Sequence, residues 1–552
     1  MKNFQTKIIL AILFLVIAAG FFGVRENFKI NEARAVGNVY YVSTNGNASW
    51  SQCININTPC SLATAVASAD DDDRVYLRGG NYTSQQLAPA NSGSAGHVIT
   101  FARYQAETPS FTRAGASVYL SGVSYIVIDG LTFMGGTNRQ LYIYNGATYN
   151  EVKNCTFSGN YAYATMHIHI ASNYNYIHDN MFNAGGRSTS EVDESDSILI
   201  HSSNYNRIIG NTFAEGQGHD FISLMSGSSY NVFRKNVMTV SDYWDDSYSA
   251  LDIFFGLENN SNYNIIENNM MIETGSPVGS HVPFQFNSSS FNIFRNNVAN
   301  STRGSNSIYN NKSRNSEYNS FYYNTFYDIN SWYSGYAVWT IETSATDYVR
   351  YNQFLNNIIH TSAYYGFRSA QSGYIANISD NVFRNNVIYN NSGTQVRRNT
   401  TNMTLAQAEA SYPAEFSGNL TLDPQFVTPG SDFSLKSGSP AIDSGAWLTT
   451  IESASGIVSS FLVDNPYYFY DGHGISGLTG DVIKTENNQK TTIQTINYDT
   501  GTIVVSPAIN IEKGEGVALD YSGSAPDIGA HEYIGGNSDT TTPSIPAGFS
   551  VR

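Results

Sequence analysis

Tyr174-Asn-Tyr-Ile-His-Asp-Asn180 returns along the chain as Tyr205-Asn-Arg-Ile-Ile-Gly-Asn211 and Tyr230-Asn-Val-Phe-Arg-Lys-Asn236. Each copy places a second asparagine five residues after the first. Eight such pairs occur: Asn175/Asn180, Asn206/Asn211, Asn231/Asn236, Asn264/Asn269, Asn292/Asn297, Asn319/Asn324, Asn352/Asn357 and Asn381/Asn386. The first members of successive pairs are 25 to 33 residues apart. A repeat of this length indicates stacked supersecondary units.

Each repeat consists of short apolar runs separated by turns, such as Ile198-Leu-Ile200 and Asn211-Thr-Phe213, with no 3.6-residue helical pattern. Parallel strands stack about 4.8 Å apart, so the asparagines at one position of each coil meet their copies above and below. An inward asparagine amide both donates and accepts hydrogen bonds, which allows such a column to satisfy itself. The pattern therefore predicts an all-β fold, a parallel β-helix.

The composition limits the kind of partner. Only 13% of the 552 residues are charged, the net charge is −16, and there are 39 tyrosines. The negative charge argues against nucleic acid and against anionic membrane surfaces. A polar, uncharged and tyrosine-rich surface suits contact with carbohydrate, and it also suits a stiff extracellular rod.

The N-terminus has the features of an export signal. Lys2 and Lys7 precede the apolar run Ile8–Phe22, and Ala33-Arg-Ala35 offers a cleavage site. We expect residues 1–35 to be a signal peptide, with retention as a membrane anchor as the alternative, and the protein to be secreted or held at the cell surface. Export permits disulfides, so Cys53 and Cys60 are predicted to pair. Cys155 is expected to be a buried core thiol.

Two further regions carry a resemblance to a known group. Residues 38–84 read as a strand, an amphipathic helix over about Ser61–Ala69 and a second strand, and the C-terminal side contains Leu422-Asp-Pro-Gln-Phe426 and Ala525-Pro-Asp-Ile-Gly-Ala-His-Glu-Tyr533. This organisation resembles bacterial secreted right-handed parallel β-helix proteins of the pectate-lyase-like superfamily. The resemblance implies a right-handed parallel β-helix (solenoid) whose first coils are closed by the helical cap.

The expected organisation has five parts. Residues 36–445 form the β-helix with its N-terminal cap, after the signal peptide. Residues 446–524, which show short alternating strands and turn signals, form a small inserted β-module. Residues 525–535 are the closing segment of the β-helix, and residues 536–552 are a flexible linker with the start of a possible fibronectin-type module.

Laying the coils over one another predicts one polar outer face. The alternation of strand side chains predicts as inward Met166, Ile168 and Ile170, then Phe221, Ser223 and Met225, then Leu251, Ile253 and Phe255, then Val282, Phe284 and Phe286. The outward set is then His167, His169, His201, Asp220, Asp252, His281, Tyr309, Asn311, Trp339 and Arg368. From it we expect substrate-binding roles for His167, His169, His201, Tyr309, Trp339 and Arg368. A solvated outer face is the alternative.

Two chemistries fit that face. In the first, Asp220 and Asp252 lie on adjacent coils with Cα atoms about 8 Å apart, and they serve as the two carboxyl groups of a glycoside hydrolase. His281 is a third candidate catalytic residue on the same face.

In the second, a lyase removes a proton next to a uronate carboxylate. Asn311-Lys-Ser313, followed by Asn324-Thr-Phe326, is similar to the catalytic-lysine coil of alginate and chondroitin lyases. That resemblance implies that Lys312 is the base. Calcium could be held by the oxygen ligands of Asp220, Asp245, Asp246 and Asp252.

The sequence therefore favours a secreted, monomeric, carbohydrate-active protein that cleaves an extended polysaccharide as a lyase or a glycoside hydrolase. Calcium is the only cofactor considered, and no nucleic acid or membrane partner is expected beyond the possible N-terminal anchor. The alternative is a non-catalytic adhesive or glycan-binding β-helix at the cell surface.

Overall fold

The computed structural model describes residues 37–136, 138–159, 163–183, 196–214, 220–240, 251–274, 280–302, 306–309, 315–329, 337–361, 365–369, 373–389 and 394–535. The predicted signal peptide and the C-terminal linker lie outside the described residues.

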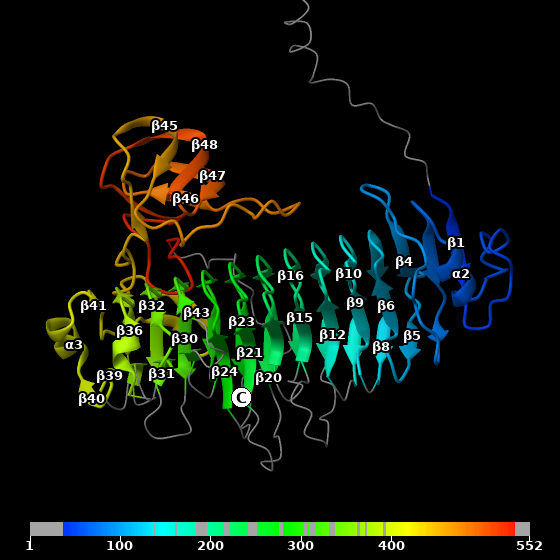
Figure 1. The fold of residues 1–552 in the computed structure, drawn as a ribbon, viewed down its shortest axis with the longest axis horizontal. Helices are drawn as coiled ribbons and strands as arrows, with labels where there is room; N and C mark the ends of the chain where they lie inside the picture. Colours follow the sequence, from blue (N-terminus) through cyan, green and yellow to red (C-terminus); the bar gives the residue numbers. More distant parts are fainter. Residues whose placement is uncertain are drawn as a thin grey trace, which may run out of the picture. The chain divides into compact units, whose positions relative to one another are not determined.

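Three parallel sheets, here called A, B and C, run the length of the coils (Figure 1). Each full coil contributes one strand to sheet C, then one to A, then one to B, and parallel pairing joins each strand to its counterparts in neighbouring coils. The predicted right-handed parallel β-helix is confirmed. The same arrangement explains the length of the repeat, because one repeat is one coil.

Sheet A comprises β1 (Val39–Val42), β2 (Arg74–Leu77), β4 (Ile99–Arg103), β7 (Ile126–Asp129), β10 (Glu151–Lys153), β13 (Tyr176–His178), β16 (Arg207–Ile209), β19 (Val232–Arg234), β22 (Ile265–Glu267), β25 (Ile293–Arg295), β29 (Ser320–Tyr322), β33 (Gln353–Leu355), β37 (Val382–Arg384) and β41 (Phe416–Ser417). Sheet B comprises β3 (Gly80–Asn81), β5 (Pro109–Thr112), β8 (Thr132–Met134), β11 (Thr156–Ser158), β14 (Met181–Asn183), β17 (Thr212–Ala214), β20 (Val237–Val240), β23 (Met270–Glu273), β26 (Val298–Asn300), β30 (Thr325–Ile329), β34 (Ile358–Thr361) and β38 (Val387–Tyr389). Sheet C comprises β6 (Val118–Ser121), β9 (Leu141–Tyr144), β12 (Ala164–His169), β15 (Asp196–His201), β18 (Asp220–Met225), β21 (Leu251–Glu258), β24 (Ser280–Asn287), β27 (Asn306–Tyr309), β31 (Ala337–Ile341), β35 (Tyr365–Ser369), β39 (Val396–Arg398) and the antiparallel β40 (Thr401–Met403).

The asparagine pairs form two ladders inside the corners of the coils. Asn236 is representative: its Nδ2 donates to Asn269 Oδ1 (3.0 Å) and to the Ile208 carbonyl (2.9 Å), while its Oδ1 accepts from the backbone N–H and the Nδ2 of Asn211. The preceding residue, Lys235, has φ +56°, a left-handed conformation that turns the chain sharply at the corner. Every polar atom of the amide is thereby paired without water.

A stack of aromatic rings, mostly tyrosines, runs along the outside of one corner. Each ring belongs to the residue immediately before the first asparagine of a pair. Successive rings are nearly parallel and about one strand spacing apart, as in Tyr174–Tyr205 (4.9 Å, 5°) and Tyr230–Tyr263 (5.0 Å, 2°). These tyrosines also have positive φ, for example +59° at Tyr205 and +57° at Tyr263. The asparagine and tyrosine of one turn therefore stack separately, inside and outside the same corner.

The strands of sheet C do not alternate strictly between inside and outside. Phe221 and Ile222 are both buried in the main core, and so are Phe254 with Phe255 and Val338 with Trp339. One inward row runs through Met166, Ile198, Ile222, Phe255 and Phe284. A strict period of two cannot describe strands that turn two consecutive side chains inward.

Four sequence-based assignments to the inner or outer face are wrong. Ser223 and Met225, predicted inward, pair with Leu199 and His201 on the outer face. Ile170 is 41% exposed in a turn with φ +50°. Trp339, predicted to bind substrate on the outer face, is only 2% exposed, and its ring packs against phenylalanine rings of the core, among them Phe354 at 4.4 Å.

The predicted capping helix is present as α2 (Leu62–Ser68), with Ser61 as its N-cap. It buries Leu62 and Ala65 against the first coils. At the other end, α3 (Leu405–Ser411) begins at Thr404 with a capping box and buries Leu405 and Ala408. Among the described residues, no helix has the length and apolar character needed to cross a membrane.

Smaller elements complete the coils. They are β28 (Ser316–Glu317), β32 (Val349–Arg350) and β36 (Ile378–Ser379), which pair in parallel, the short helix η1 (Ile375–Asn377), and the antiparallel pair β42 (Phe426–Thr428) and β43 (Asp432–Leu435).

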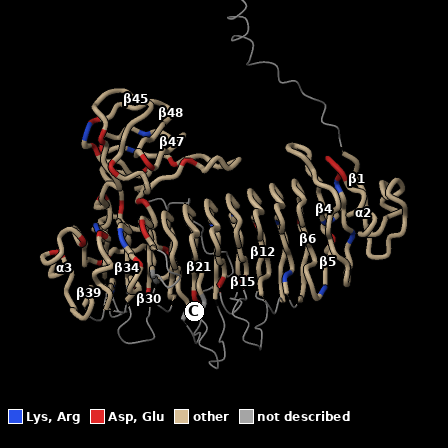
Figure 2. The backbone as a smooth tube through the Cα atoms, viewed as in Figure 1, with Lys and Arg blue, Asp and Glu red and all other residues tan. Residues whose placement is uncertain are grey.

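Residues 449–519 form an antiparallel sheet of their own. Its strands are β44 (Thr449–Thr450), β45 (Gly456–Leu462), β46 (Val482–Thr485), β47 (Lys490–Asn497), β48 (Thr502–Ile511) and β49 (Gly516–Leu519). This C-terminal module contacts the outer face of sheet A through a buried ion cluster: Arg295 pairs with Asp481 of the module (2.6 Å) and with Glu267 of sheet A (2.6 Å). Elsewhere the coils carry few charged residues (Figure 2).

The predicted disulfide is absent. Cys53 and Cys60 are both free thiols and fully buried, and the Cys60 thiol donates to Cys53 Sγ at 2.7 Å. Burial, together with this hydrogen bond, raises the pKa of Cys60, which keeps the sulfur protonated, whereas the thiolate is the form that undergoes disulfide chemistry. Cys155 is a buried thiol in the core, as expected.

The ladder gives a direct stability prediction. Asn236→Asp keeps the shape of the side chain but replaces the donating Nδ2 by an acceptor that faces Ile208 O and Asn269 Oδ1. We expect the free energy of unfolding to fall by about 3 kcal/mol or more, because a buried negative charge is placed against two acceptor oxygens. Urea unfolding followed by circular dichroism measures this.

Asn57→Asp, on the exposed N-terminal loop, is the matched control and should shift the midpoint little. Equal midpoints for the two variants would show that the ladder contributes nothing specific.

Candidate functional site

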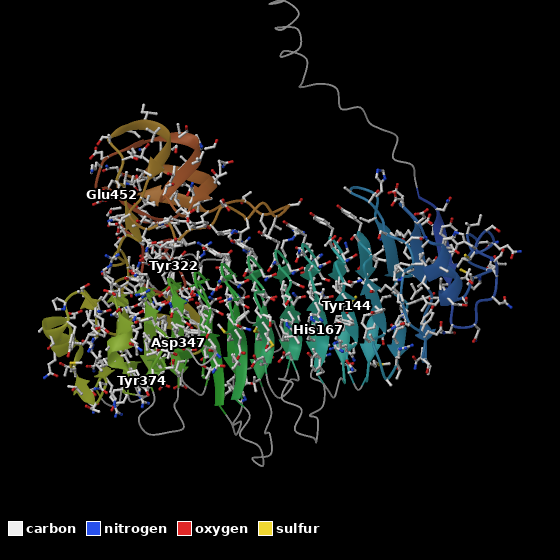
Figure 3. The ribbon with its side chains drawn as sticks, in the orientation of Figure 1. Tyr144, His167, Tyr322, Asp347, Tyr374 and Glu452 are labelled. Atoms are coloured by element: carbon white, nitrogen blue, oxygen red, sulfur yellow. The ribbon has the colours of Figure 1, made fainter. Side chains whose placement is uncertain are left out.

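A cluster of aromatic and histidine side chains occupies the outer face of sheet C on β9, β12 and β15. The pairing of these strands places His167 beside Tyr142 on one coil and Leu199 on the next. It also places His169 between Tyr144 and His201. The structure therefore brings together the three predicted substrate-binding histidines, His167, His169 and His201, and adds the tyrosines of β9, which sequence reasoning missed (Figure 3 labels Tyr144 and His167).

The rings of this cluster stack on one another. His167 and His169 have ring centroids 4.6 Å apart, and His169 and His201 have centroids 4.5 Å apart, with interplanar angles of 11° and 14°. Tyr142 stacks on His167 at 5.1 Å, and its hydroxyl lies 3.0 Å from His169 Nδ1. Rings stacked face to face present their edges to the surroundings, and here the edges carry hydroxyl groups and ring nitrogens.

Arg139 determines which nitrogen of the His167 ring carries the proton. Its guanidinium lies over the rings of Tyr142 (4.7 Å) and Tyr163 (4.3 Å), a favourable cation–π arrangement. Its Nε donates to His167 Nδ1 at 2.8 Å. An arginine nitrogen can only donate, so Nδ1 must be the unprotonated nitrogen of the ring.

His167 is consequently a neutral ring with its proton on Nε2. Burial, reinforced by the charges of Arg139 and the neighbouring histidines, lowers its pKa to about 2. Burial lowers the pKa of His169 to about 4 in the same way. His167 is fully buried, and its Nε2 has no hydrogen-bond partner in the described part of the chain. A buried donor without an acceptor lowers the stability of the folded chain.

The nitrogens of the three imidazoles lie close enough together to raise the question of a metal site. One nitrogen from each of His167, His169 and His201 lies within 4.8 Å of the others. Zinc needs nitrogen lone pairs that converge at about 2.0–2.1 Å, whereas the lone pairs of parallel rings point side by side. Arg139 adds a positive charge and occupies the lone pair of His167. The arrangement therefore fits an oxygen acceptor better than a metal ion.

Two carboxylates lie together at the beginning of adjacent sheet C strands, Asp196 on β15 and Asp220 on β18. Ile198 pairs with Ile222, so Asp196 faces Asp220 two residues earlier, and the Asp220 N–H donates to Asp196 Oδ1 at 3.3 Å. Asp220 Oδ2 accepts from Ser223 Oγ at 2.6 Å, and a Cβ at Gly256 would collide with it. Asp196 and Asp220 are 1% and 5% exposed.

Asp196 was missed by sequence reasoning, although a signal existed. Asp196-Ser-Ile-Leu-Ile and Asp220-Phe-Ile-Ser-Leu both open a sheet C strand with aspartate two residues before an inward isoleucine. The predicted register of Asp252 is off by three positions, because Asp252 lies one position before the partner of Asp220 and not two positions after it. Asp220 faces Ile253, and Asp252 faces His281 on the following coil.

The remaining predicted residues are dispersed. His281 is 1% exposed, and its Nδ1 lies 3.2 Å from Glu273 Oε2. Arg368 lies in the same row as Thr340 and Arg397, far along sheet C from the histidines. Lys312, Asp245, Asp246 and Asn311 lie outside the described residues, as do the side chains of Asp252 and Tyr309.

No protein-family model matches the chain, and no curated protein matches it in sequence. Similar solved structures include pectate lyase Pel9A, with 17% identity over 90% of this chain and 96% of that chain and a TM-score of 0.47. A PL6 alginate lyase in complex with a trisaccharide has 14% identity over 71% and 90%, with a TM-score of 0.41. The catalytic domain of a GH87 α-1,3-glucanase in complex with nigerose has 15% identity over 63% and 64%, with a TM-score of 0.39.

The parallel β-helix is established by the chain's own stacked sheets. Similarity at these levels does not transfer an activity to this chain.

The buried neutral histidines predict a pH dependence of stability. An unfolded histidine has a pKa near about 6.5, while His167 and His169 have folded pKa values of about 2 and about 4. Below about pH 6.5 the unfolded chain binds more protons than the folded one, so acidification from pH 7 to 5 lowers the stability. We expect His167→Asn, whose amide oxygen can still accept from Arg139, to show a smaller fall in Tm over this range.

His178 provides the opposite control. Burial, the largest single influence, lowers its pKa, but hydrogen bonds to Glu151 and Asp179 outweigh it and the pKa is raised. Its contribution to stability is present at low pH and is lost as pH rises, so His178→Asn should steepen the fall in Tm on acidification. Identical pH profiles for wild type and both variants would contradict the assignment.

Proposed function

We propose that the protein is an exported, carbohydrate-active enzyme that binds an extended polysaccharide on the outer face of sheet C and hydrolyses it with Asp196 and Asp220. The observation that carries the proposal is the stack of His167, His169 and His201 on the outer face of sheet C, in which the rings of His169 and His201 are partly exposed. Hydroxyl groups of a bound glycan can form hydrogen bonds with these exposed ring edges.

The stacked rings gather their polar edges on one small area. The His169 ring centroid lies 4.6 Å from that of His167 and 4.5 Å from that of His201, and the centroids of His167 and His201 are 6.4 Å apart. The three rings therefore form a compact cluster that can contact neighbouring hydroxyl groups of one bound glycan. The low pKa values of His167 and His169 keep these rings uncharged at neutral pH, which suits hydrogen bonding to hydroxyl groups.

The carboxylate pair supplies the chemistry. Strands of adjacent coils lie about 4.8 Å apart, which brings Asp196 and Asp220 near the separation of about 5–5.5 Å used by retaining glycosidases. One carboxylic acid donates its proton to the glycosidic oxygen, and the other carboxylate attacks the sugar carbon. Water then breaks the resulting ester, and the first residue takes the proton from that water.

The contacts of Asp220 with Ser223 and Gly256 support a division into nucleophile and acid. Ser223 donates a hydrogen bond to Asp220, which stabilises the ionised carboxylate, and Gly256 leaves room beside it. We therefore assign Asp220 as the nucleophile and Asp196 as the acid. Asp196 lies on the same strand as His201, five residues or about 16 Å away, so a chain held at the histidines reaches the carboxylates within a few sugar units.

The test is to incubate purified wild type, Asp196→Asn and Asp220→Asn with a panel of neutral and uronate polysaccharides, with EDTA or with calcium. We expect the wild type to release new reducing ends without ultraviolet absorption. Each Asn variant should lower the rate at least 100-fold, because each removes one of the two required carboxyl groups. Asp499→Asn, exposed in the C-terminal module, is the matched control and should be fully active.

An unsaturated, ultraviolet-absorbing product would contradict hydrolysis and support a lyase reaction. Lys312 would then be the base to test next. Loss of activity in EDTA would establish the calcium requirement considered for Asp220, Asp245, Asp246 and Asp252. Binding without any product would favour the non-catalytic alternative. Full activity of both Asn variants would dismiss the carboxylate pair.

A further inference from the structure

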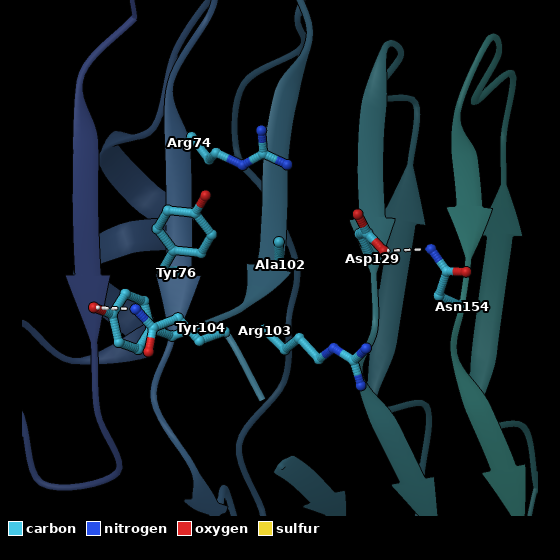
Figure 4. A pocket seen from close by; sticks show the side chains of 8 residues that line it. Arg74, Tyr76, Ala102, Arg103, Tyr104, Asp129 and Asn154 are labelled. Atoms are coloured by element: carbon cyan, nitrogen blue, oxygen red, sulfur yellow. Dashed lines mark hydrogen bonds between the residues drawn. The ribbon is translucent and has the colours of Figure 1, made fainter. Parts of the chain in front are cut away.

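A second surface with unused binding groups lies on sheet A, at the opposite end of the coils from the C-terminal module. The module contacts sheet A from β16 onward, through Arg207, Arg234 and Arg295. In the part of the chain that the structure describes, the module makes no hydrogen bond or ion pair with the strands from β2 to β13. Figure 4 shows the pocket found on this open stretch.

The pocket has a volume of about 500 Å³ and spans β2, β4 and β7 and the turn after β10. It is lined by Arg74, Tyr76, Ala102, Arg103, Tyr104, Gln105, Asp129 and Asn154. Ala102, the only aliphatic member, is 4% exposed and lies at the floor. A small residue at the floor leaves the space that the larger side chains surround.

Two arginines in this pocket pair with no carboxylate. In the described structure, the guanidinium groups of Arg74 and Arg103 make no ion pair and no hydrogen bond, and both residues are exposed. Arg78, on the same side of the chain, shows the contrast: its guanidinium pairs with Glu107 at 2.8 Å. Positive groups left without a partner are unusual in a chain with a net charge of −16.

The tyrosines form the other half of the pocket. The rings of Tyr76 and Tyr104 lie 5.6 Å apart at an angle of 76°, so they present surfaces in two directions. The Arg74 guanidinium lies 5.4 Å from the centre of the Tyr76 ring. Tyrosine combines an apolar ring face with a polar tip, which suits a sugar ring with its hydroxyl groups.

The amide groups complete the polar lining. Asn154 Nδ2 donates to Asp129 Oδ1 at 2.8 Å, and Gln105 Nε2 donates to the Tyr104 hydroxyl at 3.1 Å. Both amide oxygens remain as acceptors for sugar hydroxyl groups. Two arginines against one aspartate leave the lining with a net charge of +1.

We propose that this pocket is a second, non-catalytic glycan site that binds a carboxylated sugar unit, with its carboxylate on Arg74 or Arg103 and its ring against Tyr76 or Tyr104. Arginine guanidinium groups match the geometry of a carboxylate with two parallel hydrogen bonds. The site lies on sheet A and the proposed cleavage site lies on sheet C, so this inference does not depend on the proposed reaction.

The test measures affinity for polygalacturonate and for the same polymer with its carboxylates methyl-esterified, by isothermal calorimetry at low salt. We expect the wild type to bind the free acid at least tenfold more tightly than the ester. The double variant Arg74→Gln/Arg103→Gln should bind the free acid at least tenfold more weakly than the wild type. It should keep the wild-type circular dichroism spectrum and the wild-type turnover of whatever neutral substrate the protein cleaves.

Two further variants keep the test specific. Lys490→Gln/Lys513→Gln removes the same number of charges from the C-terminal module, where both lysines are exposed, and should leave binding unchanged. Arg74→Lys/Arg103→Lys keeps the charge but loses the two-pronged geometry, and should bind with intermediate affinity.

Equal affinity for acid and ester, or equal loss in the two charge-removing variants, would overturn the proposal. Tighter binding of dextran sulfate than of polygalacturonate would also overturn the assignment to carboxylated sugars. Preserved binding in the Gln variant together with loss in Asp196→Asn would place the acidic glycan on sheet C instead.

Discussion

The hydrogen bond from one asparagine amide to the next is the interaction on which the rest of the structure depends. Each ladder oxygen accepts both the backbone N–H and the side-chain Nδ2 of the coil before it, as at Asn211 and Asn236. Such a bond forms only when adjacent corners are in register. The corners therefore fix the register of every strand that begins or ends there. The same register determines which side chains lie beside one another on the outer faces of the sheets.

The fold was predictable because the sequence repeats the residues that create this register. The asparagine spacing, the cap helix after Ser61 and the alternating strands of the C-terminal module all follow from local patterns. The wrong assignments share one cause. Where Phe221 and Ile222, or Val338 and Trp339, both turn inward, a rule of alternation puts the wrong side chains outside. The sequence predicts a disulfide between Cys53 and Cys60 because an exported chain can form one, whereas the burial and protonation of the two thiols are properties of the folded chain.

The candidate site was predictable only in part. His167, His169 and His201 share a face because two of them alternate on one strand and the third follows one coil later, and both facts are visible in the sequence. Arg139 and Tyr142 enter the cluster from a preceding coil outside the eight-pair repeat, so no pattern connects them to the histidines. The protonation state of His167 depends on that contact and on burial, which are properties of the assembled coils.

The column of tyrosines has a consequence for how the protein can be observed. Rings held parallel at about 5 Å, as in Tyr149–Tyr174 and Tyr205–Tyr230, couple electronically, so the column should behave as one extended chromophore in near-ultraviolet circular dichroism. In the coils away from the C-terminal module Tyr149 is 45% exposed, whereas further along the column Phe291 and Tyr318 contact Tyr467 of the module. The near-ultraviolet circular dichroism of the column should therefore change when the coils lose their register or when the C-terminal module leaves its contacts with the column.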